Sequence, residues 1–155
     1  MRLDAWAVIA IVAIGCGCAG GDDRDGPERR IGGEAYEFPS APAVVEGPLA
    51  PGAEDALDRL LPPALIGIVD GEVLNEVAAA RDPRLAWIVS DLLRFYPGGV
   101  EVDRLVSAFT TLTGVDVRQD PLYAGGAWRT VTDHMIAWDT PAPPRYRERK
   151  AQIYT

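Results

Sequence analysis

The sequence has few of the residues that build covalent or metal-based sites. Its two cysteines, Cys16 and Cys18, lie near the N-terminus, and no cysteine follows them. The folded part therefore has no disulfide and no set of thiolate ligands. The single histidine, His134, excludes a site made of several histidines. We predict no metal, no other cofactor, and a fold stabilised by packing alone.

Positive charge is also scarce. The 155 residues contain 15 lysines and arginines against 23 aspartates and glutamates, which gives a formal net charge of −8. A protein that binds nucleic acid needs a basic face for the phosphates. The composition therefore argues against a nucleic-acid partner. The one basic cluster, residues 145–150, is interrupted by Glu148 and is expected to be a solvated helix end. Contact with anionic lipid headgroups is the alternative.

Catalytic motifs are missing as well. The serines at 40, 90 and 107 lie outside any G-x-S-x-G context, and the glycines form neither G-x-G-x-x-G nor a P-loop. Asp70-Gly71-Glu72 begins like a calcium loop, but the alternating ligands do not follow. Asp133-His134 lacks a nucleophile, and we expect His134 to be half-buried and hydrogen-bonded at the edge of a helix. The sequence predicts that the protein is not an enzyme.

What the sequence does contain is an apolar run at its start, residues 5–15. This run is about half the ~20 residues that a membrane-spanning helix needs. A short charged opening, an apolar core and small residues form the three-part pattern of a secretory signal.

The end of that run, Ala13-Ile14-Gly15-Cys16, resembles the lipobox of bacterial lipoproteins. The resemblance implies cleavage after residue 15 and a Cys16 that carries acyl chains, which would hold the protein on a membrane. It also implies a place in the bacterial cell envelope, facing away from the cytoplasm. Ala13 and Asp4 depart from the usual pattern, and Cys18 is a second, poorer candidate. An ordinary cleaved signal and a short membrane helix are the alternatives.

Residues 16–52 are predicted to be a flexible tether. Glycines and prolines recur throughout, and low hydrophobicity with excess acid prevents a segment from burying enough surface to fold. Such a coil would hold the remaining chain some 30 Å from the lipid. Tyr36 and Phe38 are its main apolar groups. They are either a short docking motif or residues without a role.

Residues 53–155 are predicted to be one all-α domain. Residues 53–61 form a short helix that Pro62-Pro63 should stop. Residues 64–69 are a short apolar run that suits a strand or a buried helix. Residues 71–81 continue as a helix, with one buried side formed by Val73, Leu74, Val77 and Ala78.

The clearest predicted element is a helical hairpin. Asp82 is a good N-cap before Pro83, and the helix over 84–96 has an apolar stripe widened by Leu93 and Phe95. A second amphipathic helix begins near Val102 and ends at Gly114, which suits a left-handed cap. The stripe residues are Leu85, Ile88, Val89, Leu92 and Tyr96 on the first helix, and Val102, Leu105, Val106, Phe109 and Leu112 on the second.

This pair of helices resembles a HEAT-type repeat, a family whose stacked helix pairs bind partner proteins. The sequence holds one convincing copy, whereas solenoids need three or more. A small helical bundle fits equally well, so the fold class is all-α in either arrangement.

The last part of the chain predicts two further helices. Residues 127–138 place Trp128, Val131, Met135 and Trp138 on one side. A proline-rich spacer over 139–144 then leads to a short basic helix over 145–155, with Tyr146 and Ile153 facing inward.

The polar side of the helix over 84–96 carries the best candidate for a protein-binding surface, which comprises Trp87, Asp91 and Arg94. Aromatic residues and arginines are enriched at interface hot spots. The alternative is that Trp87 packs under a neighbouring helix. The sequence thus predicts a lipid-anchored binding or scaffold module with an unidentified protein partner. The runner-up is a helical accessory segment of a longer envelope enzyme or β-rich protein, and a stand-alone hydrolase comes third.

Overall fold

The computed structural model describes residues 30, 31, 33–65, 67–96 and 98–153. The described part is all-α, as predicted, apart from a two-strand hairpin of β1 (Arg30–Ile31) and β2 (Glu34–Ala35). Its helices are α1 (Pro51–Leu65), α2 (Gly71–Ala79), α3 (Ala86–Leu93), α4 (Val100–Thr113), α5 (Ala127–Ala137) and α6 (Pro144–Ile153), with short 3₁₀ helices η1 (Pro83–Leu85), η2 (Val117–Gln119) and η3 (Pro121–Gly125). The expected lipid-attachment site at Cys16 lies outside the described residues.

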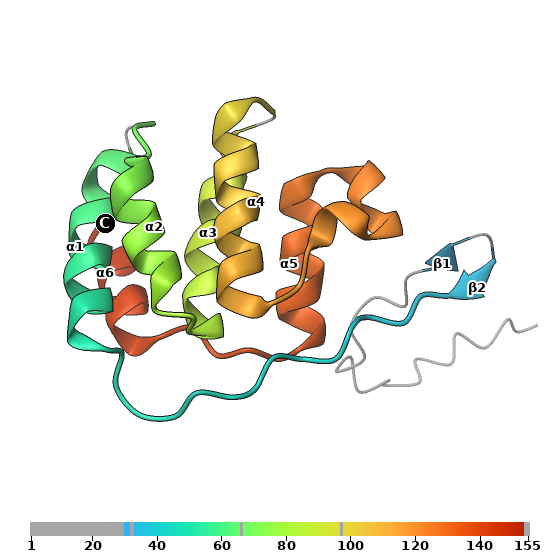
Figure 1. Cartoon of the computed structure of the whole chain (residues 1–155), viewed down its shortest axis with the longest axis horizontal. Helices are drawn as coiled ribbons and strands as arrows, with labels where there is room; N and C mark the ends of the chain where they lie inside the picture. The colour runs from blue at the N-terminus through green and yellow to red at the C-terminus, as the bar shows by residue number, and fades with distance from the viewer. Residues whose placement is uncertain (1–29, 32, 66, 97, 154–155) are drawn as a thin grey trace, which may run out of the picture.

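Helices α1 to α5 form a continuous series of packed neighbours, in which α3 lies behind α4 in the view of Figure 1. Helix α1 packs against α2, α2 against α4, α4 against α3, and α3 against α5. A single core runs through all of them. Phe109 of α4, Leu92 of α3 and Leu57 of α1 are examples of its buried side chains.

Helix α1 is longer than predicted, because Pro62 and Pro63 lie inside it. A proline keeps a φ that a helix accepts, but it lacks an N–H donor and its ring crowds the carbonyl four residues earlier. Both prolines stand in the last turn of α1, so the hydrogen bonds that they remove lie at the end of the helix. Burial of Leu61 and Ala64 on either side of the pair continues the packed face.

The apolar run over 64–69 is not a strand, and of its described residues only the first two are helical, where Ala64 is buried in the last turn of α1. Gly67 has φ +89°, and Ile68 N–H donates to the Pro63 carbonyl at 2.9 Å. A left-handed glycine with such a long backward bond is a helix C-cap. The run therefore ends α1 and turns the chain into α2, leaving Ile68 exposed.

The predicted hairpin of two helices is confirmed, with two differences. The Asp82 side chain accepts a hydrogen bond from Arg84 N–H, but the first turn is the 3₁₀ helix η1. Helix α3 ends at Leu93, and the next two residues follow in a tighter turn. That turn rotates Phe95 out of the stripe, so Phe95 is 55% exposed rather than buried. Gly114 closes α4 with φ +77°, as expected.

In α5 the predicted inward side is correct for Val131 and Met135, which are buried, and wrong for Trp128. Trp128 lies in the first turn of α5, where its side chain lines a cavity and does not pack into the core. Tyr146 of α6 is buried, as predicted. The expected orientation of Ile153 lies outside the side chains that the structure describes.

The predicted tether differs most from the structure. Residues 36–49, here called the strap, run along one end of the helices from α5 to α1 (Figure 1). Tyr36 bonds to Asp120, Trp138 bonds to Pro39, and Leu49 is buried in the core. These contacts fix the second half of residues 16–52 on the helices, and α1 begins at Pro51.

Candidate functional site

The three residues predicted to form a protein-binding surface are placed in different surroundings. Trp87 is half-buried against the core, and its indole Nε1–H donates to the Thr140 carbonyl at 2.6 Å. The Asp91 carboxylate accepts a hydrogen bond from the Tyr146 hydroxyl. Arg94 is exposed, with its guanidinium carbon 5.9 Å from the centre of the Trp128 ring. Trp87 and Asp91 thus hold the C-terminal segment, and Arg94 faces solvent.

Arg94 and Trp128 stand at the rim of a cavity of about 500 Å³. The end of α3, the start of α4, and η3 with the start of α5 surround it. Two glycine pairs, 98–99 and 125–126, form parts of its wall. A Cβ built on Gly98 or Gly126 would meet nothing within 4 Å, so the backbone is open there. We call Arg94, Trp128 and Arg129 around this cavity the partner face.

One wall of this cavity contains a buried hydroxyl. The Tyr96 Oη has no hydrogen-bond partner in the described part of the chain. Burial, followed by the nearby charge of Glu101, raises the pKa of Tyr96. The phenol therefore keeps its proton at neutral pH and remains a hydrogen-bond donor.

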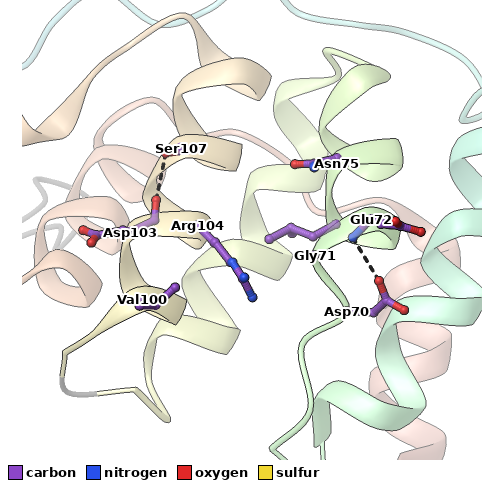
Figure 2. Close-up of a pocket in the computed structure, with 9 residues that line it drawn as sticks. Asp70, Gly71, Glu72, Asn75, Val100, Asp103, Arg104 and Ser107 are labelled. Atoms are coloured by element: carbon purple, nitrogen blue, oxygen red, sulfur yellow. Dashed lines mark hydrogen bonds between the residues drawn. The ribbon is translucent and has the colours of Figure 1, made fainter.

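A second hollow of about 520 Å³ lies between α2 and α4. Figure 2 shows Arg104 reaching from α4 toward Gly71, where an added Cβ would lie 3.8 Å from the guanidinium. Several of the other polar groups are already hydrogen-bonded, and Arg118 of η2 donates to the Ser107 hydroxyl at 2.7 Å. Asp70 caps α2 by accepting from Glu72 N–H at 2.9 Å, and the Ser107 hydroxyl donates to the Asp103 carbonyl at 2.8 Å (Figure 2). This hollow is an open polar groove with both signs of charge.

His134 is completely buried, in contrast to the half-buried position predicted. Its Nδ1–H donates to the Thr130 carbonyl at 2.8 Å, and its Nε2 lies 3.0 Å from Asp120 Oδ2. Asp120 also caps η3 by accepting from Leu122 N–H at 2.7 Å, and it accepts the Tyr36 hydroxyl. The imidazole has no open side toward solvent. Its neighbours make it part of a buried polar cluster that holds the strap.

The strap itself contributes residues that sequence reasoning left undecided. Phe38 meets the His134 ring edge-on, with centroids 5.1 Å apart, and Trp138 Nε1–H donates to the Pro39 carbonyl at 2.7 Å. At the other end Arg84 donates to the Gly47 carbonyl at 2.7 Å while its guanidinium is paired with Asp82. The pair of Tyr36 and Phe38 was the one sequence signal for this docking.

The described residues contain neither a candidate metal site nor a candidate membrane-spanning helix. No group of three or more histidine, cysteine, aspartate or glutamate side chains there is arranged to hold a metal ion. No helix within the described ranges has the length and apolar content to cross a membrane.

Comparisons with known proteins add no further guide. No family model, no curated protein and no solved structure matches this chain. The functional argument therefore rests on its own residues.

Proposed function

We propose that the protein is a lipid-anchored, extracytoplasmic binding module in a bacterial cell envelope. The segment Ala13-Ile14-Gly15-Cys16 supports the anchor, with acyl chains on Cys16. The strap also supports the proposal. From Tyr36 onward it is bonded to the helices, so the binding module would be attached to its anchor at one defined end. About twenty residues of the sequence separate Cys16 from Tyr36.

The partner face is the surface that carries the proposed binding. The observation that carries the proposal is the contact between Arg94 and the exposed ring of Trp128 beside an open cavity. Tryptophan and arginine are over-represented among residues that dominate binding energy. A surface tryptophan that is 45% exposed has apolar area left to bury against a partner protein.

Site-specific photo-crosslinking in intact host cells tests the partner face. A benzoylphenylalanine at position 95, next to Arg94, should give a defined crosslinked species. The same probe at Ile68 is the matched control, because Phe95 and Ile68 are 55% and 58% exposed. Trp128→Ala should remove the crosslink from position 95. Equal crosslinking from both positions, or no effect of Trp128→Ala, would contradict the proposal.

A further inference from the structure

The strap lies on the helices as an extended segment with alternating exposure. Tyr36 and Phe38 are half-buried, whereas Glu37 and Pro39 are exposed. Successive side chains of an extended chain point to opposite sides, so this alternation is typical of a peptide lying on a surface. Pro39 favours that backbone, because the residue before a proline is restricted to extended conformations.

Each contacting residue of the strap meets a different chemical group. The Tyr36 hydroxyl donates to the Asp120 carboxylate. The Phe38 ring packs edge-on against the His134 imidazole. The Pro39 carbonyl accepts from the Trp138 indole. A hydroxyl, an aromatic ring and a backbone carbonyl are thus recognised in order along four residues.

The surface beneath the strap is held in place by bonds that do not involve the strap. Asp120 is fixed by Leu122 N–H, and the His134 ring is fixed by the Thr130 carbonyl. Trp138 stacks on the core residue Phe109, with centroids 6.1 Å apart and an interplanar angle of 8°. A rigid surface of this kind binds with little ordering cost.

We infer that Asp120, His134 and Trp138 form a peptide-binding groove for extended Tyr-x-Phe-Pro segments. The groove is filled in this structure by the chain's own strap, and it accepts the same pattern from a partner protein. The second attachment, at Gly47 and Leu49, keeps the strap on α1 when its first part leaves. Grooves lined by aromatic side chains are a general way of binding proline-containing extended peptides. The inference goes beyond the proposed function, since neither the anchor nor the partner face takes part.

Fluorescence polarisation on the full chain in detergent tests the groove. The probe is a fluorescein-labelled peptide of residues 34–42. In the wild type the tethered strap competes at a high effective concentration, so the peptide should bind weakly. Phe38→Ala weakens the strap and should raise peptide affinity by about tenfold or more. Adding Trp138→Phe, which removes the indole donor, should lower that affinity again.

Two controls keep the result specific. Val44→Ala changes a strap residue that is 77% exposed, and it should behave as the wild type does. A peptide with alanine at both aromatic positions should not bind. If Phe38→Ala lowers the melting temperature too far, Tyr36→Phe replaces it, because that change removes only the hydroxyl. Equal peptide affinity in wild type and variant, or equal binding of the alanine peptide, would overturn the inference.

Discussion

The indole nitrogen of Trp138 donates a hydrogen bond to the carbonyl of Pro39, 99 residues earlier in the chain, at 2.7 Å. This bond joins the last turn of α5 to the segment that leads back toward the N-terminus. Together with the bond from Tyr36 to Asp120, it makes the strap part of the folded body. The partner face and the strap therefore belong to the same folded body.

Asp120 is expected to be the most sensitive polar residue of this connection. Asp120→Ala removes the cap of η3, the acceptor for Tyr36 and the carboxylate beside His134. Leaving the half-buried Tyr36 hydroxyl without its acceptor, together with losing the cap of η3, should lower the free energy of unfolding by about 2–4 kcal/mol. Asp116→Ala is the matched control, because Asp116 caps η2 but is 38% exposed. Urea denaturation should give the control a loss of about 1 kcal/mol. Equal losses would contradict the role of the buried cluster.

Tyr36 should make stability depend on alkaline pH. Burial, followed by the hydrogen bond to Asp120 and its charge, raises the pKa of Tyr36 well above the ordinary value of 10.0. A raised pKa favours the protonated phenol in the folded state, so its contribution is complete below about pH 10 and declines above it. The difference in unfolding free energy between wild type and Tyr36→Phe should be constant from pH 7 to 9.5 and shrink toward pH 11.5. A difference that grows with pH would be the wrong sign for this account.

Trp87 is expected to act in stability. Trp87→Ala removes a half-buried indole and its bond to the Thr140 carbonyl, so the free energy of unfolding should fall by about 2–4 kcal/mol. Arg94→Ala, on the exposed side, should change it by no more than about 0.5 kcal/mol. Thermal and chemical melts of the two variants measure this. If Trp87→Ala is as stable as the wild type, the structural role of Trp87 is contradicted and a role in partner binding is favoured.

The helical hairpin can be tested with two phenylalanines in different surroundings. Phe109 of α4 is fully buried, whereas Phe95 after α3 is 55% exposed. Phe109→Ala should cost about 3–5 kcal/mol, and Leu92→Ala about 2–5 kcal/mol. Phe95→Ala should cost less than 1 kcal/mol. Similar effects of Phe109→Ala and Phe95→Ala in urea denaturation would rule out the described packing.

The parts of the fold that the sequence predicted are those set by local periodicity. The apolar stripe on α4 and the cap at Gly114 depend on residues that are close in the sequence, so the sequence alone predicts both. The exposure of Phe95 and Trp128 was not, because it depends on where a helix ends relative to its neighbours. The continuation of α1 through Pro62 and Pro63 likewise depends on burial of the surrounding residues.

The strap shows the limit of the same reasoning. Tyr36 and Phe38 stand in a segment without a helical or strand period, and the nearest bonding partner of Tyr36 lies 84 residues away. Local pattern carries no information about such a distant contact. The sequence analysis did not single out Asp120, whose roles as the cap of η3 and as the acceptor for Tyr36 appear only in the structure.

The anchor is the claim on which the proposed function depends most. Metabolic labelling of host cells with a palmitate analogue, followed by fractionation in a detergent that separates lipid-modified from unmodified protein, measures it directly. Cys16→Ala should abolish the label and move the protein out of the membrane fraction, whereas Cys18→Ala should retain both. Absence of label on the wild type, together with unchanged partitioning of Cys16→Ala, would contradict the lipid-anchored account.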